Sequence, residues 1–211
     1  MPKIDVHLLH MPNGIEIVGD ISSPHIVVRH KEGIVGNTLN ARLNAFALGS
    51  EPYISFVDPD DEVNVDAFKI CLDELEANPE LGGVYTNSTI IHHNPNIYDR
   101  PHFLDHVWSK EYHMSRMNPI HQLTVMRRSV YEQIIEQMLQ GITPFRHLLL
   151  SYSEQIMYAY IASVAPWKFI NVNGYNWYKR VGTNHSNASI EITNIVRAHI
   201  KEILTRSMLD K

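Results

Sequence analysis

The residues best suited to do chemistry form one acidic cluster, Asp58-Pro59-Asp60-Asp61, which directly follows the apolar run 53–57. Three carboxylates within four residues repel one another unless water or a cation neutralises them. Their hard oxygen atoms suit Mg²⁺ or Mn²⁺, which keep several waters and bridge to substrate phosphates. A plain turn that caps the following helix is the alternative interpretation, because Asp and Pro are ordinary turn residues. The four residues alone favour neither.

Strands and helices alternate along the chain, which predicts an α/β fold with its ligand site at the carboxyl edge of a sheet. Apolar and β-branched runs predict strands over 3–9, 25–29, 53–57, 83–87, 123–126 and 168–172. Helical spacing predicts helices over 38–48, 65–78, 130–139, 153–164 and 190–208. Asn64 is placed to cap the second of these helices, and 173–187 is expected to be a loop.

The composition is that of an ordinary globular protein, and it excludes several classes. The 211 residues carry a formal net charge of -5, which argues against a dedicated nucleic-acid binder. The single cysteine, Cys71, rules out an intrachain disulfide and favours a reducing compartment. The N-terminus lacks the apolar run of a signal peptide, and no segment approaches the ~20 apolar residues of a membrane span. We therefore expect a soluble, cytoplasmic protein.

The stretch from Arg42 to Asp61 resembles the signature region of the family-2 glycosyltransferases. In that family a helix bearing Ala-Arg-Asn leads to a strand of the form Tyr-hydrophobic-x-Phe-hydrophobic, followed by Asp-x-Asp-Asp. The positions that match in register are Ala41, Arg42, Tyr53, Phe56, Asp58, Asp60 and Asp61. Leu43 departs from the pattern, because it stands where the family has Asn.

The resemblance implies a GT-A fold, a Rossmann-like mixed sheet flanked by helices. Residues 1–187 would form the GT-A domain, and 188–211 a C-terminal helix that packs on the domain or makes a homodimer. The implied function is a metal-dependent, inverting transfer of a sugar from a nucleotide sugar, above all a UDP-sugar, to a hydroxyl acceptor.

The resemblance also implies roles for the acidic cluster. Asp58 would lie near the ribose of the donor, in a donor-binding set that includes Arg42. Asp60 would be the main ligand of Mn²⁺ or Mg²⁺ on the diphosphate, with Asp61 as a second ligand or a structural cap. His185, in a segment that resembles the family's donor-covering loop, would complete the metal shell.

An inverting transfer needs a base to accept the proton of the acceptor hydroxyl. Ser153-Glu154-Gln155 resembles the start of a family helix that carries Glu-Asp, so Glu154 is the expected catalytic base. The alternative is a first-turn carboxylate favoured by the helix dipole. His121 and Gln122 are expected on the acceptor side, and Arg128 is expected to anchor structure.

The remaining donor-binding residues are expected in the turns and loops around the site. Lys179 and Arg180 can neutralise phosphate, although a solvated loop is the alternative there. The nucleobase and ribose pocket is expected from residues that follow the first two strands: His10, Pro12, Asn13, Arg29 and His30. Relatives often carry an Asp after the second strand, and that Asp is missing here.

Glycans are the commonest acceptors in the family, and a hydroxymethylated DNA base is the other acceptor that we consider. A DNA acceptor would meet a basic and aromatic surface made by Arg100, Trp108, Tyr112, Arg116 and Arg127. A nucleotidyltransferase is an alternative function, but 11–20 lacks the Gly-rich basic loop of that class. A non-catalytic binding module with a GT-A-like fold is the other alternative, because Gln155 and Leu43 replace family residues.

Overall fold

The computed structural model describes residues 2–10, 14, 16–32, 38–92, 98–102, 107–116, 119–142, 153–179 and 190–209. The strands are β1 (Ile4–His10), β2 (Ile26–Glu32), β3 (Tyr53–Val57), β4 (Glu62–Val63), β5 (Gly83–His92), β6 (Arg100–His102), β7 (Thr124–Arg127) and β8 (Trp167–Lys179). The helices are α1 (Thr38–Phe46), α2 (Val65–Ala77), α3 (Lys110–Ser115), α4 (Arg128–Ile142), α5 (Ser153–Val164) and α6 (Ile190–Leu209).

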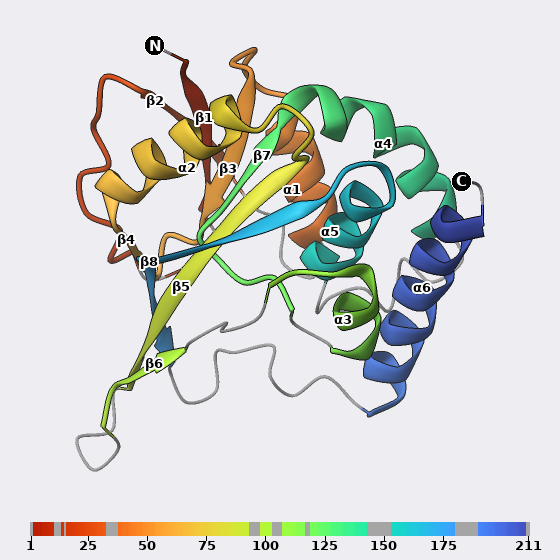
Figure 1. Cartoon of the computed structure of the whole chain (residues 1–211). Helices are drawn as coiled ribbons and strands as arrows, with labels where there is room; N and C mark the ends of the chain where they lie inside the picture. Colours follow the sequence, from red (N-terminus) through yellow and green to blue (C-terminus); the bar gives the residue numbers. More distant parts are fainter. Residues whose placement is uncertain are drawn as a thin grey trace.

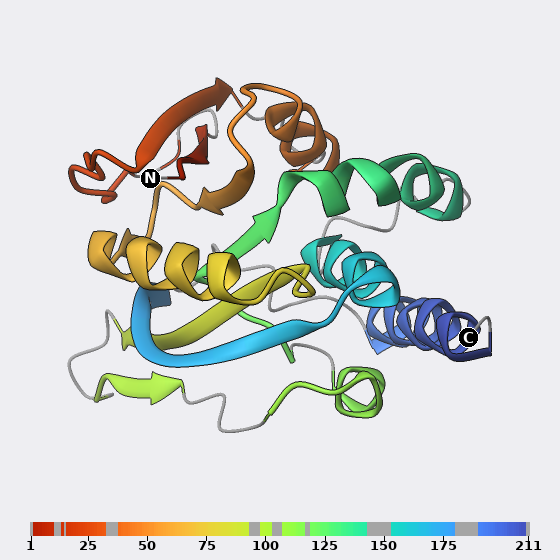
Figure 2. The same cartoon turned by 45° about the horizontal axis from the view of Figure 1, so that its top comes forward.

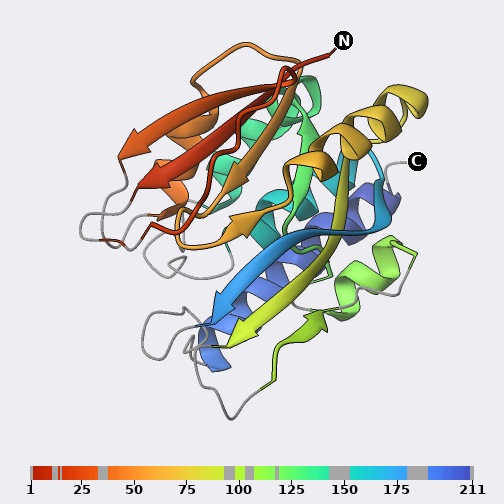
Figure 3. The same ribbon diagram turned by 90° about the vertical axis from the view of Figure 1, so that its left-hand side faces the viewer.

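The strands form one mixed sheet in the order β2-β1-β3-β7-β5-β8-β4, with β6 paired to β5 (Figure 1). Strands β1, β2 and β3 are parallel, β7 is antiparallel to both β3 and β5, and β8 is parallel to β5. The carboxyl ends of β1, β2, β3, β5 and β8 therefore meet at one edge of the sheet, as Figure 3 shows. The predicted mixed α/β sheet is confirmed.

Helices cover both faces of the sheet (Figure 2). On one face α2 packs Phe68, Cys71, Leu72 and Leu75 onto the sheet, because these apolar residues recur at helical spacing. Its predicted cap is confirmed, since Asn64 accepts a 3.1 Å hydrogen bond from the backbone N–H of Asp66. The other face is covered by α1, α4 and α5, with α6 outside them.

The C-terminal helix buries its apolar face on its own chain. Val196, Ile200 and Leu204 of α6 are buried in the same core cluster as Tyr158 and Ile161 of α5. Because this face is already covered, it is not the surface through which α6 could form the predicted homodimer. Among the described residues, none of the helices has the length and apolarity that a bilayer crossing requires.

Strand β8 is the largest departure from the sequence prediction. It continues through 173–179, where a loop was expected, because β5 pairs with it on one side and β4 on the other. Gly174 is needed here, since a Cβ atom would lie 2.3 Å from the hydroxyl of Thr86 on β5. In this part of β8, Asn alternates with Val, Gly and Tyr, and this composition obscured the strand pattern. β5 likewise runs to His92, beyond the predicted end at 87.

Candidate functional site

Arg42 joins the two parts of the predicted site. Its Nη2 atom donates to Asp58 Oδ1 at 2.9 Å, and its Nη1 atom donates to Glu154 Oε2 at 3.0 Å. The guanidinium lies 4.5 Å from the centre of the Phe56 ring, and its side chain is only 13 % exposed. The structure thus brings together Arg42, Asp58 and Glu154, which the sequence places on a helix, after a strand and at the start of a distant helix.

The two carboxylates compensate the charge of this guanidinium. Burial alone lowers the pKa of Arg42, but Asp58 and then Glu154 outweigh it and hold the pKa above its ordinary value. Asp58 and Glu154 themselves are 31 % and 28 % exposed, so water and substrate can reach both. Glu154 also lies in the first turn of α5, where the helix dipole favours a carboxylate.

Strand β8 holds the acidic turn in place. The hydroxyl of Tyr175 accepts from the backbone N–H of Asp58 at 3.2 Å and donates to Asp61 Oδ2 at 2.9 Å. The backbone N–H of Tyr178 donates to Asp61 Oδ1 at 2.8 Å. Within the turn, the N–H of Asp61 donates to the carbonyl of Asp58 at 3.0 Å. Sequence analysis missed Tyr175, because the second half of β8, from residue 173, was predicted as a loop.

Asp61 was predicted to be either a second metal ligand or a structural cap, and its contacts fit the structural role. Its side chain belongs to a residue that is 4 % exposed, and both of its carboxylate oxygens accept hydrogen bonds from β8. Burial, followed by the nearby charge of Asp58, raises the pKa of Asp61 to about 8. These contacts fit the role of Asp61 as a structural support of the turn, and its role as a metal ligand stays a prediction. Asp60, on the same turn, is partly exposed.

The described residues test whether the site fits a metal. No three His, Cys, Asp or Glu side chains within the described ranges are grouped to hold an ion. Mg²⁺, however, is usually bound by one or two carboxylates together with substrate phosphates and water. Asp60 fits that arrangement if a diphosphate supplies further oxygen ligands. His185 and Arg180, predicted to take part, lie outside the described residues.

The end of β1 carries a second polar group of interest. His10 Nδ1 lies 2.5 Å from Glu16 Oε1, and His10 Nε2 lies 2.8 Å from His30 Nδ1. Sequence analysis placed His30 after the second strand, but the structure places it inside β2. Pro12 and Asn13, expected beside His10, lie outside the described residues.

Arg29 does not join the donor site as predicted. It lies within β2, and its Nε atom donates to Asp5 Oδ1 at 2.8 Å. Asp5 is fully buried, and its Oδ2 atom accepts from Arg128 Nη2 at 2.7 Å and from the N–H of Glu51 at 2.9 Å. Two arginines are needed there because a buried carboxylate is costly without partners. The expected anchoring role of Arg128 is confirmed, and that of Arg29 is corrected.

The predicted acceptor residues lie before β7, at the same edge of the sheet. Gln122 is buried, and the ring of His121 lies 5.5 Å from that of Trp177 on β8. Gln155, which replaces a family Asp, is buried and donates through Nε2 to the carbonyl of Ile120 at 2.8 Å. This bond ties the start of α5 to the acceptor segment. Lys179 is exposed at the end of β8.

The predicted DNA-binding surface lacks Arg127 at the ligand edge. Arg127 lies at the opposite edge of the sheet, where it donates to the carbonyls of Leu81 and Asn78 and to the hydroxyl of Tyr53. Trp108 packs against the core, and Arg116 lies over the ring of Tyr112. The side chain of Arg100 is outside the described part of the chain.

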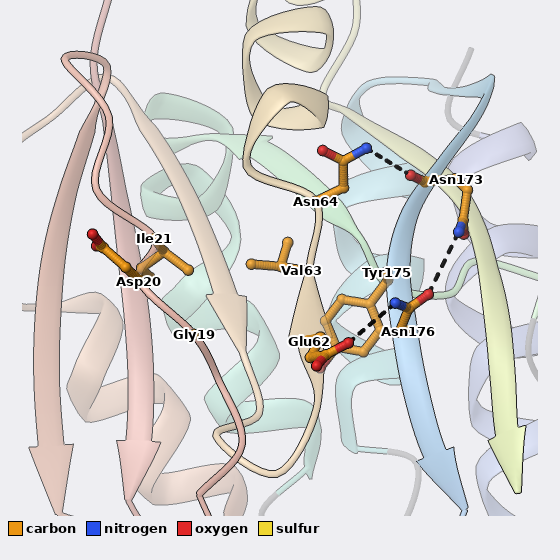
Figure 4. A pocket seen from close by; sticks show the side chains of 9 residues that line it. All are labelled: Gly19, Asp20, Ile21, Glu62, Val63, Asn64, Asn173, Tyr175 and Asn176. Atoms are coloured by element: carbon orange, nitrogen blue, oxygen red, sulfur yellow. Dashed lines mark hydrogen bonds between the residues drawn. The ribbon is translucent and has the colours of Figure 1, made fainter.

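A polar cavity of about 350 Å³ lies beside the acidic turn, between the segment 19–21 and the β4–β8 pair (Figure 4). Glu62, Asn64, Asn173 and Asn176 line it, and Asn176 donates to Glu62 at 3.3 Å. Asp58, Asp60 and Glu154 are not among its lining residues. It is therefore separate from the Arg42 bridge.

No protein-family model matches the chain, and no curated protein is similar to it in sequence. Solved structures of S. aureus TarS are similar in fold. TarS 1-349 in complex with UDP-GlcNAc has a TM-score of 0.59 and 13% identity, covering 98% of this chain and 71% of that one. The complex with UDP has a TM-score of 0.57 and 12% identity, covering 98% and 70%. For TarS itself the TM-score is 0.56 and the identity is 13%, covering 98% of this chain and 43% of that one.

TarS is a GT-A-type glycosyltransferase, so this likeness confirms the predicted GT-A fold. At 12–13% identity it establishes the fold alone. What the chain does must therefore be argued from its own residues.

Proposed function

We propose that this chain is a metal-dependent, inverting glycosyltransferase that moves a sugar from a UDP-sugar to a hydroxyl acceptor. The observation that carries the proposal is the Arg42 bridge, which holds Asp58 and Glu154 together at the ligand edge of a GT-A sheet. The TarS structures with UDP-GlcNAc and UDP support the choice of donor.

Each residue of the bridge has a role in this proposal. Asp58 accepts hydrogen bonds from the ribose hydroxyls of the donor. Glu154 accepts the proton of the acceptor hydroxyl as that oxygen bonds to the anomeric carbon, on the face opposite the leaving diphosphate. The bond from the anomeric carbon to the diphosphate oxygen breaks, and the nucleoside diphosphate leaves with that electron pair. Arg42 keeps Glu154 at a set distance from the ribose subsite, and Lys179 is available to neutralise phosphate charge.

Asp60 is the residue that we assign to hold Mn²⁺ or Mg²⁺, with diphosphate oxygens and water as the remaining ligands. When bound, such a cation supplies Lewis-acid stabilisation of the negative charge that develops on the leaving group. One carboxylate by itself binds Mn²⁺ or Mg²⁺ only weakly, so we propose that the metal binds only together with the nucleotide. Titration of Mn²⁺ with and without nucleotide therefore measures this binding without any turnover.

The test measures donor hydrolysis and nucleotide binding with a panel of nucleotide sugars, with and without Mn²⁺. The wild type is compared with Asp60→Ala and with the control Asp73→Ala. Asp73 lies on the exposed face of α2 and pairs with Lys69 at the surface, where an ion pair contributes little. We expect metal-dependent binding of a UDP-sugar that Asp60→Ala abolishes and Asp73→Ala retains. Absence of nucleotide binding under every metal condition would contradict the proposal and favour a non-catalytic module.

The acceptor is tested in the same assay. A glycan hydroxyl is the acceptor class that we propose first, because the predicted DNA surface loses Arg127 to the opposite edge of the sheet. Duplex and single-stranded DNA with hydroxymethylated bases form the second arm. The cytoplasmic location and the homodimer stay predictions, which cell fractionation and light scattering can check.

A further inference from the structure

The polar cavity between the segment 19–21 and the β4–β8 pair has no part in the catalytic roles proposed above (Figure 4). Its volume of about 350 Å³ lies within the range of small-molecule sites, roughly 300–1,000 Å³. Such sites are usually lined by apolar side chains with a few polar groups. In this cavity, amide and carboxylate side chains make up five of the nine lining residues: Asp20, Glu62, Asn64, Asn173 and Asn176. The cavity therefore suits a ligand that is covered with hydrogen-bonding groups.

The amides of the cavity are held in a ladder of hydrogen bonds along β4 and β8 (Figure 4). Asn64 Nδ2 donates to the carbonyl of Asn173 at 3.2 Å, and Asn173 Nδ2 donates to Asn176 Oδ1 at 3.5 Å. Asn176 Nδ2 in turn donates to Glu62 Oε2 at 3.3 Å. An amide has two N–H bonds and its oxygen has two lone pairs, so Asn173 and Asn176 keep both donor and acceptor capacity for a ligand.

Apolar groups complete the lining of the cavity. Ile21, Val63 and the ring of Tyr175 contribute to it beside the amide ladder. A sugar ring has the same division, because hydroxyl groups surround its rim and C–H groups cover its faces. Each hydroxyl group can donate and accept, as an amide side chain can. The mixed lining therefore matches a sugar ring better than a uniformly polar or apolar molecule.

The charges of the lining argue against an ionic ligand. The described residues that line the cavity include no Lys, Arg or His, whereas Asp20 and Glu62 carry negative charge, so an anion is disfavoured. Asp20 Oδ1 already accepts from the N–H of Ser22 at 2.8 Å, and Glu62 Oε2 accepts from Asn176. Within the described ranges, no third His, Cys, Asp or Glu joins these two carboxylates to hold a cation. A neutral ligand with several hydroxyl groups fits the cavity best.

We propose that this cavity binds one neutral sugar unit, at a site separate from the transfer site. Asn173 and Asn176 exchange hydrogen bonds with its hydroxyl groups, and Glu62 accepts from one of them. The cavity shares Tyr175 with the acidic turn, because the hydroxyl of Tyr175 donates to Asp61. In the proposed function, the site anchors a glycan acceptor through a unit other than the one that receives the sugar. That use rests on the proposed function, whereas the binding itself does not.

The experiment is a proton–nitrogen NMR titration of the full chain with the methyl glycosides of glucose, galactose and N-acetylglucosamine, without nucleotide or metal. We expect at least one glycoside to bind with a Kd of the order of 1 mM, because a ligand of this size gains little binding energy per atom. The resonances of Asn173, Tyr175 and Asn176 should shift most. Those of Arg42 and Glu154, at the transfer site, should shift little.

Three variants test whether the side chains of the cavity make this binding. Asn176→Leu keeps roughly the volume of the side chain but removes its amide, and it should weaken binding roughly five- to tenfold. Asn44→Leu makes the same change at an exposed position of α1, outside the cavity lining, and should bind like the wild type. Glu62→Gln removes a charge but keeps an acceptor oxygen, so the affinity for a neutral sugar should stay within roughly threefold. The NMR spectrum of each variant also shows whether it is folded.

The outcomes separate this inference from its rivals and from the proposed function. Absence of shifts at the cavity with all three glycosides overturns it, as does an unchanged affinity in folded Asn176→Leu. Shifts confined to Arg42 and Glu154 also overturn it, because the sugar then binds only at the transfer site. Binding of Ca²⁺ that Glu62→Gln abolishes, without sugar binding, would assign the cavity to a cation instead. Nucleotide binding tests the proposed function separately, so either one can fail while the other stands.

Discussion

Arg42 donates to Glu154 at 3.0 Å and to Asp58 at 2.9 Å, and these two contacts connect the start of α5 to the turn after β3. The connection matters because a base must be held within hydrogen-bonding reach of the proton that it accepts. Phe56 lies beneath the guanidinium at 4.5 Å and limits where it can move. Arg42 is thus a positioning residue in the proposed reaction.

Replacing Arg42 should therefore lower kcat more than it raises KM. We expect Arg42→Ala to reduce kcat for sugar transfer by roughly 100-fold, a loss typical of a misplaced catalytic group. Arg42→Lys keeps the charge but reaches only one carboxylate well, so it should recover part of the loss. Steady-state kinetics at varied donor concentration measures the split. Equal kcat in the wild type and in folded Arg42→Ala would contradict the role.

Tyr175→Phe should destabilise the protein, because the buried Asp61 loses one of its partners. We expect the free energy of unfolding to fall by about 1–3 kcal/mol, the cost of leaving a buried polar group unpaired. Urea unfolding measures the change, and UDP affinity should fall with it, because the acidic turn loosens.

Tyr85→Phe is the matched control for that variant. Tyr85 is fully buried, and its hydroxyl has no hydrogen-bond partner among the described residues. Removing this hydroxyl should leave the free energy of unfolding unchanged or raise it. A loss as large as that of Tyr175→Phe would show that deleting any buried hydroxyl, rather than the bond to Asp61, explains the effect.

His113 should make the protein less stable at acid pH. Burial lowers the pKa of His113 in the fold to about 3, whereas the unfolded side chain titrates near 6.5. The unfolded state therefore binds the proton first, and stability falls as the pH drops from about 6.5 toward 3, by about 1.4 kcal/mol per pH unit at most. Urea unfolding at several pH values should show a shallower decline for His113→Phe than for the wild type and for the control His25→Phe.

Arg128→Met should destabilise the sheet strongly, because among the described residues it leaves the buried Asp5 with Arg29 as its one cationic partner. Breaking such a buried pair costs about 3–5 kcal/mol. The control Arg116→Met makes the same change at an exposed arginine and should cost about 0.5 kcal/mol or less. Chemical unfolding of both variants measures the difference, and similar losses would show that Arg128 does not anchor the fold.

The sequence by itself determined the elements whose signals are local. The bounds of β3 and α5 were predicted without error, and Asn64 was identified as the cap of α2. An apolar run, helical spacing and a capping side chain all act within a few residues, so one stretch of sequence contains the whole cause. The acidic cluster at the end of β3 was found for the same reason.

Only the tertiary structure decided which polar residues meet. Arg29 looks like a member of the donor site in sequence, yet it pairs with the buried Asp5, to which Arg128 also comes from far along the chain. Asp61 is held as a buried support of the turn, because β8 brings Tyr175 to it. The bridge from Asp58 through Arg42 to Glu154 likewise depends on three separate elements. Electrostatic partners of this kind are set by distance in space, which no local pattern of residues encodes.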